Sequence, residues 1–274
     1  MVILILVVWG LCFGSFVNAL VWRIHEQSKA KTKKARAELS IMKGRSMCPH
    51  CKHTLGAHDL LPVISWLSLG GKCRYCHKPI AWQYPVVELI TALLFVASYL
   101  WWPYGFDTIG TVMFAGWLAV LIGLVALTVY DLKWMLLPNR LTYPLMALWS
   151  VVIVIASVLR GDVSLIVSST LGVIFCGGIF WVLYQVSDGR WIGGGDVKLG
   201  FLLGLIVGGP LNALFVIFIA SLIGTFVALP LMALKKVNRS SQIPFGPYLI
   251  VGGVLVFLFH EYFVQVLNSQ ILLP

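Results

Sequence analysis

The sequence predicts an all-α polytopic membrane protein, with about eight transmembrane helices and one small loop domain on the cytosolic side. Three observations support this prediction: the composition, a series of long apolar segments, and the placement of the basic residues. Hydrophobic residues make up 59% of the 274 and charged residues only 11%, against about 45–50% and about 25% in a soluble globular domain. The same composition excludes intrinsic disorder, and six cysteines are too few for a disulfide-rich secreted scaffold.

Seven apolar segments approach the ~20 residues that a helix needs to cross the hydrocarbon core. They cover residues 2–22, 81–102, 109–130, 143–159, 163–186, 211–234 and 247–264. An eighth segment, 197–209, is only 13 residues long before the turn signal Gly208-Gly209-Pro210 interrupts it. It would form about 20 Å of helix, too little to span a bilayer of full thickness.

The basic residues predict the orientation of these segments. Of the 20 Lys and Arg, 19 fall in the four loops 23–80, 131–142, 187–198 and 235–246, and only Arg160 lies on the other side. Because cytosolic loops carry the excess of Lys and Arg, these four loops are expected in the cytosol and both termini outside it. The alternation requires eight crossings, so the short segment 197–209 is expected to cross as well.

Two cysteine pairs in the first cytosolic loop predict a metal site. Cys48-Pro49-His50-Cys51 and Cys73-Arg74-Tyr75-Cys76 are separated by 21 residues, a spacing typical of a four-thiolate zinc centre. The alternative, disulfides or redox pairs, is disfavoured in a reducing compartment. The chain is therefore expected to divide into a first helix (1–22), a basic and zinc-binding module (23–80) and a helical membrane core (81–274).

The basic stretch from Arg23 to Arg45 holds eight Lys/Arg and two Glu. We expect it to lie beside anionic lipid headgroups, so membrane lipids are predicted partners. A nucleic-acid site would interleave aromatic side chains, and this stretch contains no Phe, Trp or Tyr. Nucleic acid is therefore not a predicted partner.

Few acidic residues lie in or beside the apolar segments, and Glu88, Asp131 and Asp196 are among them. Carboxylates in a membrane are costly and therefore suggest function. Taken singly, Asp196 could cap a helix after the turn Gly193-Gly194-Gly195, and Asp131 could be an interfacial residue next to Lys133. Taken together, they form a possible dyad that shares a proton, with one carboxylate as base and the other as acid.

The residues around these aspartates resemble a known family. Gly193-x-Gly195-Asp196-Val-Lys198-Leu is similar to the GxGD signature of polytopic aspartic peptidases, and the segment from Asp131 through Pro138-Asn139 to Thr142 resembles the prepilin peptidase branch. The similarity extends over nearly the whole chain, through Gly14-Ser15-Phe16-x-Asn18 with Arg23, the run from Arg45 through the cysteine tetrad to Glu88, and Ile243-Pro244-Phe245-Gly246-Pro247.

This resemblance implies eight helices in a bacterial inner membrane and an intramembrane aspartic endopeptidase that removes the leader of type IV prepilins and pseudopilins at the cytosolic face. It also implies methylation of the new N-terminus with S-adenosylmethionine. The residues carried over are Asp131 and Asp196 as the catalytic pair and, as metal ligands, Cys48, Cys51, Cys73 and Cys76.

Four further residues are expected near the substrate. Gly193 and Gly195 permit a close backbone approach and unusual φ/ψ angles, so a substrate strand could lie against their turn. Lys198 could be an interfacial snorkelling residue or could stabilise the charge of the dyad. Glu88 is expected to contact the new N-terminus of the substrate or an adjacent helix rather than to catalyse.

Other classes fit less well. A zinc metalloprotease needs a second helical histidine, which neither His25-Glu26 nor His260-Glu261 has at the required spacing. An ion-coupled transporter also uses broken helices and buried acids, but the cysteine module and the lack of detectable inverted repeats favour the peptidase. A zinc-stabilised membrane scaffold would not need both aspartates.

Overall fold

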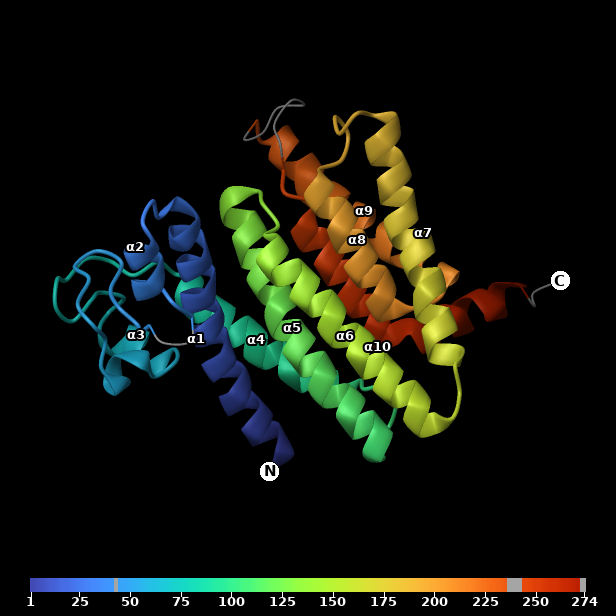
Figure 1. The fold of residues 1–274 in the computed structure, drawn as a ribbon, viewed down its shortest axis with the longest axis horizontal. Helices are drawn as coiled ribbons and strands as arrows, with labels where there is room; N and C mark the ends of the chain where they lie inside the picture. The colour runs from blue at the N-terminus through green and yellow to red at the C-terminus, as the bar shows by residue number, and fades with distance from the viewer. Residues whose placement is uncertain (42–43, 236–242, 272–274) are drawn as a thin grey trace. The chain divides into compact units, whose positions relative to one another are not determined.

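The computed structural model describes residues 1–41, 44–235 and 243–271, and every regular element in these ranges is a helix. The chain forms two compact units, Met1–Leu100 and Trp101–Pro274, which are described separately. The first contains α1 (Val2–Lys29), α2 (Lys33–Glu38), η1 (Ala57–Leu60), α3 (Ile64–Ser68) and α4 (Gln83–Leu100). The second contains α5 (Thr108–Trp134), α6 (Asn139–Arg160), α7 (Ser164–Val186), α8 (Gly194–Val207), α9 (Pro210–Ala233) and α10 (Gly246–Ile271), as Figure 1 shows.

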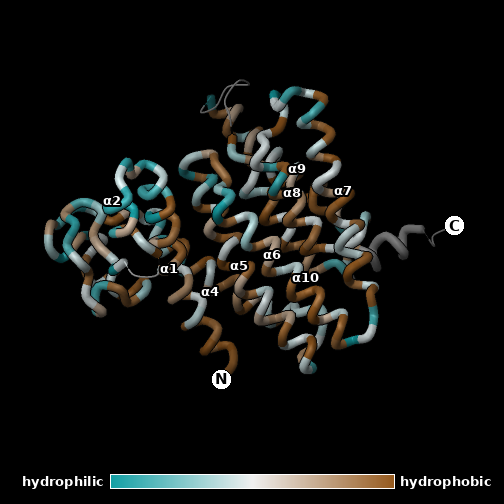
Figure 2. The backbone as a smooth tube through the Cα atoms, in the orientation of Figure 1, coloured by the Kyte–Doolittle hydropathy of each residue, from teal (hydrophilic) through white to brown (hydrophobic). Residues whose placement is uncertain are grey.

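Each of the eight predicted segments coincides with one helix. Six of these helices are long and apolar enough to cross a membrane, and α8 and the apolar part of α10, Gly246–His260, are shorter. Figure 2 shows the hydrophobic residues concentrated along these helices and the hydrophilic ones in the loops of the first unit. The fold class is therefore confirmed within the described ranges. Residues 236–242, which belong to the fourth predicted basic loop, lie outside them.

In the first unit, α1 packs closely against α4 through small residues. A Cβ at Gly14 would lie 2.6 Å from the Glu88 Cα, so only glycine allows this approach. The helix α1 continues past the predicted end at Trp22 because its polar last turns find partners. The Arg23 guanidinium donates to the carbonyls of three residues in the following segment, Ser40, Ile41 and Gly44.

In the second unit, α8 lies between α6, α7 and α10 (Figure 1). Its contact with α7 is close because a Cβ at Gly172 would collide with the Gly204 carbonyl oxygen, a small-residue contact common between membrane helices. The helix has 14 residues, about 21 Å. It ends at Gly208 and Gly209, whose φ angles of 62° and 65° favour glycine, and α9 begins directly at Pro210.

Candidate active site and metal centre

Asp131 lies in the last turn of α5 and is buried. The helix ends just beyond it, where Met135 adopts a left-handed conformation and its N–H donates to the Asp131 carbonyl at 2.8 Å. The first residue of α10 comes against the carboxylate, because a Cβ at Gly246 would lie 2.6 Å from Asp131 Oδ2. No side chain larger than glycine fits there without a shift.

Asp196 is the third residue of α8, whose N-cap is Gly193. Its side chain turns back toward that cap: a Cβ at Gly193 would lie 3.4 Å from Asp196 Oδ2. A carboxylate in the first turn is also favoured by the partial positive charge of the helix N-terminus. Asp196 is partly exposed, whereas Asp131 is buried.

The two predicted dyad residues are brought together. They belong to helices far apart in sequence, yet the Asp131 and Asp196 carboxylates are near enough to interact electrostatically. A Cβ at Gly246 would also lie 3.6 Å from Leu199 Cδ2, so the start of α10 touches both α5 and α8. The result is a carboxylate pair where α5 ends and α8 and α10 begin.

The glycines of the turn serve packing rather than unusual backbone angles. Gly193 has φ −71°, and Gly194 and Gly195 are already helical, so these glycines do not use the unusual backbone angles that the sequence permits. Instead, a Cβ at Gly195 would lie 3.3 Å from the side chain of Leu137. The segment between α5 and α6 therefore lies directly against the first turn of α8.

Lys198 has a partner within the second unit. Its Nζ donates to Asn139 Oδ1 at 2.9 Å. Asn139 is the first residue of α6, and its position follows from Pro138, which cannot continue a preceding helix and caps the next one. The hydrogen bond joins α8 to α6 two residues after Asp196.

Glu88 lies in the first unit, in the second turn of α4, and is buried. Its Oε2 accepts a 2.7 Å hydrogen bond from the Val63 N–H. Val63 has φ 61°, a conformation that β-branched residues rarely adopt, so this bond stabilises a strained backbone position.

The two cysteine pairs fold as two similar turns. The Cys48 N–H donates to the His53 carbonyl at 3.0 Å, and the Cys73 N–H donates to the Lys78 carbonyl at 2.9 Å. In both turns the residue after the second cysteine, Lys52 or His77, has a positive φ. Each sequence of two cysteines thus folds locally into the same hairpin-like loop.

These turns bring four free thiols together. The sulfurs of Cys48, Cys51, Cys73 and Cys76 all lie within 4.8 Å of one another, and Cys48 Sγ is 3.9 Å from Cys76 Sγ. Tetrahedral zinc with Zn–S bonds of about 2.3 Å would separate its sulfurs by about 3.8 Å. Burial would raise the pKa of the Cys48 thiol, but the Cys51 and His50 backbone N–H groups lower it to about 7. The donor set therefore fits a zinc ion.

The Asp59 carboxylate connects two parts of the module through hydrogen bonds. Asp59 accepts hydrogen bonds from Arg74 Nε at 2.7 Å, from the Tyr75 hydroxyl at 3.1 Å and from the Gly56 N–H at 3.1 Å. The bond from Arg74 lowers the pKa of the Asp59 carboxyl below its usual value. This contact connects η1 to the second cysteine turn.

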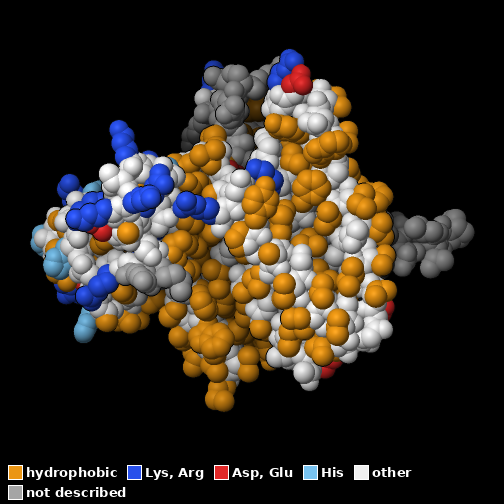
Figure 3. Space-filling view, in the orientation of Figure 1, with side chains coloured by type: hydrophobic (Ala, Val, Ile, Leu, Met, Phe, Trp, Pro, Cys, Tyr) orange, Lys and Arg blue, Asp and Glu red, His pale blue; other side chains and the backbone are white. Residues whose placement is uncertain are grey.

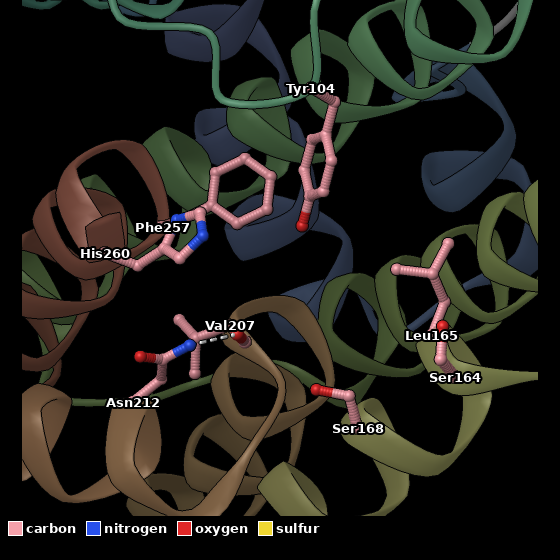
Figure 4. Close-up of a pocket in the computed structure, with 8 residues that line it drawn as sticks. All are labelled: Tyr104, Ser164, Leu165, Ser168, Val207, Asn212, Phe257 and His260. Carbon is pink, nitrogen blue, oxygen red and sulfur yellow. Dashed lines mark hydrogen bonds between the residues drawn. The ribbon is translucent and has the colours of Figure 1, made fainter. Parts of the chain in front are cut away.

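A cavity of about 370 Å³ lies at the opposite end of α8 from Asp196, since its lining includes Val207, the last residue of that helix. Eleven residues of helix separate the two, about 16 Å. Figure 4 shows the Tyr104 and Ser168 hydroxyls directed toward it and the Asn212 amide bonded to the Val207 carbonyl. The cavity is therefore separate from the carboxylate pair.

Sequence reasoning assigned no role to Gly246, Asn139, Leu137 or Asp59. Gly246, Asn139 and Leu137 lie in segments that resemble the family, and this resemblance was the only indication of their importance in the sequence. Each of them contacts a residue far away in the sequence, so no local sequence pattern predicts the contact. Asp59 stands alone in its loop, and only folding brings Arg74 to it.

Comparison with known proteins identifies the family of the chain. The bacterial peptidase A24 N-terminal domain matches residues 8–102, and the type IV leader peptidase family matches residues 118–229. The chain is 34% identical to a prepilin leader peptidase/N-methyltransferase of Aeromonas hydrophila, over 92% of this chain and 89% of that protein. It is 31% identical to the protein of that name from Stutzerimonas stutzeri, over 94% and 91%.

A type 4 prepilin-like proteins leader peptide-processing enzyme of Escherichia coli O78:H11 is 33% identical, over 90% of both chains. No solved structure matches the chain. The family models match residues in both units, and the second one includes the segments that hold Asp131 and Asp196. The chain belongs to the type IV leader peptidase family.

Proposed function

We propose that Asp131 and Asp196 are the catalytic pair with which this chain removes the leader peptide of type IV prepilins and pseudopilins. The chain is a prepilin leader peptidase that also methylates the N-terminus it exposes, as its family and its relatives' names indicate. The observation that supports the catalytic residues is that one carboxylate from α5 and one from α8 interact electrostatically where both helices contact Gly246 at the start of α10.

The pair can perform hydrolysis by proton transfer. Two neighbouring carboxylates resist simultaneous ionisation, so one keeps a proton. The ionised carboxylate takes a proton from water as the water oxygen bonds to the scissile carbonyl carbon, and the other donates its proton to the carbonyl oxygen. The C–N bond then breaks, and the leaving amine receives a proton. Either aspartate can take either role.

The surroundings of the pair suit an extended substrate. We place the substrate backbone along the turn of Gly193 and Gly195. The exposed Gly193 leaves room beside Asp196, while Gly195 lets Leu137 pack against the turn. Lys198, held by Asn139, would lie next to this strand. In the proposed orientation this end faces the cytosol, with both chain termini outside it, in a bacterial inner membrane. Water would then reach the pair from the side on which the basic leader lies.

The methylation step requires a methyl donor, which we propose is S-adenosylmethionine; when bound it supplies an electrophilic methyl group. Glu88 is proposed to contact the new N-terminal amine, because the Val63 N–H fixes the direction of its carboxylate.

Zinc is the proposed ion of the cysteine tetrad. It would join the two cysteine turns and so hold the module together, a structural role rather than a catalytic one. We further propose a functional division into a first helix (1–22), the zinc module (23–80) and the peptidase core (81–274), although α4 of that core belongs to the compact unit Met1–Leu100.

The decisive experiment uses the purified full-length protein in vesicles with a prepilin, scoring leader loss and N-methylation by mass spectrometry. Asp131→Asn and Asp196→Asn should each reduce cleavage by about 10³-fold or more, since the amide cannot exchange the proton. The matched control is Asp188→Asn, an exposed aspartate in the loop before α8 that forms a surface ion pair with Arg190 at 3.6 Å. Near-normal cleavage by either dyad variant would overturn the assignment.

A further inference from the structure

The first unit presents an apolar surface outside its two long helices. It is formed around the short helix α3 by Leu60, Leu61, Ile64, Leu67 and Trp82. We name this set the α3 apolar face. Ile64 is 63% exposed, Leu67 64% and Trp82 70%. Four of the five residues come from one apolar stretch, residues 60–67. Folding adds Trp82, which lies against Trp66 of that stretch.

The α3 apolar face is held rigidly by the residues behind it. Trp66 packs on Gly71 and lies 4.2 Å, centroid to centroid, from Trp82. Its Nε1 donates to the Ile80 carbonyl at 3.1 Å. Ile64 and Leu67, three residues apart on the helix, therefore share the side that Trp66 does not occupy. The contacts of Trp66 thus leave Ile64 and Leu67 on the exposed side of α3.

The contact with α4 indicates how deep the α3 apolar face lies relative to the membrane. This helix begins at Gln83 and is apolar enough to cross a membrane. Glu88 lies five residues after the start of α4, about 7.5 Å along the helix axis. Its carboxylate accepts a 2.7 Å hydrogen bond from the Val63 N–H. Val63 immediately precedes α3, so α3 lies at the level of the first turns of a membrane-spanning helix.

We propose that the α3 apolar face inserts into the membrane–water interface beside the start of α4 and binds phospholipid at the boundary between headgroups and acyl chains. Tryptophan beside a span, as at Trp82, is typical of that boundary. Between residues 44 and 82 the module carries five Lys/Arg and one Asp. Figure 3 shows Lys and Arg side chains gathered over this unit, which favours anionic headgroups.

This proposal concerns the lipid contact of the module and does not rest on the catalytic pair. It differs from contact by the basic stretch 23–45, because it requires acyl chains and not only charge. The competing occupant is the apolar helix of a prepilin. Both occupants would cover the same side chains, so the test must identify the molecule that touches them.

The test places the photoreactive residue benzoylphenylalanine, which bonds covalently to nearby C–H groups, in the full-length protein. Vesicles contain phosphatidylethanolamine and phosphatidylglycerol with alkyne-tagged acyl chains, with and without a prepilin. The probe replaces Ile64 in one variant and Leu67 in a second. The positive control replaces Leu93, which is 68% exposed on α4, and the negative control replaces the exposed Thr54 of the first cysteine turn.

Lipid labelling at 64 and 67 should approach that at 93 and should exceed that at 54 several-fold. Adding the prepilin should leave it unchanged. The proposal is overturned if both positions label no more than 54, or if the prepilin becomes the labelled partner in place of lipid. Unchanged gel-filtration behaviour of each variant shows that the protein remains folded.

Discussion

Lys198 Nζ and Asn139 Oδ1 are joined by a 2.9 Å hydrogen bond between α8 and α6, beside the proposed catalytic pair. Because Lys198 follows Asp196 by less than one helical turn, this bond fixes the start of α8 relative to α6. Lys198 and Asn139 are not proposed to transfer protons, but their hydrogen bond helps to position Asp196.

A double-mutant cycle tests this relationship. Asn139→Ala and Lys198→Ala should each lower kcat/KM for leader cleavage, with a coupling energy of about 1 kcal/mol, the usual net value of such a bond. The measurement is kcat/KM for the two single variants and the double variant. Additive effects would show that the two side chains act independently of each other.

Gly246→Ala should reduce cleavage by about 10²-fold, the typical cost of displacing a catalytic group by about 1 Å. The added Cβ would lie 2.6 Å from Asp131 Oδ2, so the carboxylate must move. Gly178→Ala is the matched control, because a Cβ there meets nothing within 4 Å. Equal activity of the two variants would mean that the Asp131 position is not critical.

The sequence predicts some features of the fold and the site but not others. Hydropathy predicts seven of the eight long helices of the two units, because a bilayer demands long apolar segments, and the alternation of the basic loops adds the short α8. The Gly208-Gly209-Pro210 signal predicts where α8 ends. The CxxC spacing predicts the grouping of the tetrad. The contacts of Gly246 with Asp131 and of Lys198 with Asn139 join distant segments through tertiary packing, which no pattern in one sequence encodes.

Helix ends are the other part that hydropathy does not predict. The apolar run stops at Trp22, yet α1 continues to Lys29 because Arg23 and Gln27 donate to carbonyls of the following segment. Likewise α8 begins at Gly194 rather than at Val197, since glycines are helical there. Asp196 therefore lies inside the first turn instead of preceding it.

Metal analysis should find about one zinc per chain, and Cys48→Ser or Cys73→Ser should lose it, because each pair supplies half of a tetrahedral site. Cys12→Ser is the control, since Cys12 lies in α1 outside the tetrad. We expect cleavage to suffer less than methylation in the zinc-deficient variants. Stoichiometric zinc in a variant with all four ligands replaced by serine would contradict the site.

Asp59→Asn should loosen the zinc module at neutral pH. The pKa of Asp59 is lowered in the folded state by Arg74, so its contribution to stability is complete above the ordinary Asp pKa of about 3.9 and is lost as pH falls through the lower folded value. Hydrogen exchange of residues 56–60 and 74–75 should be faster in Asp59→Asn. The difference from the unmodified protein should stay constant between pH 7 and pH 5; a difference that disappears within this window would disprove the pairing.

The last prediction concerns access to the carboxylate pair. With about 21 Å of helix against a hydrocarbon core of ~30 Å, α8 cannot reach both surfaces, so its first turn is expected to line a water-filled depression open to the cytosol.

Gly194 suits a cysteine probe, because a Cβ there would meet only Tyr184 at an ordinary 3.7 Å. In a background lacking Cys12 and Cys176, Gly194→Cys should react with a small charged thiol reagent from the cytosolic side, and bound prepilin should slow the reaction. Gly178→Cys, within α7, should stay unreactive, while labelling of Gly194→Cys from the outer side alone would place the pair on the wrong face of the membrane.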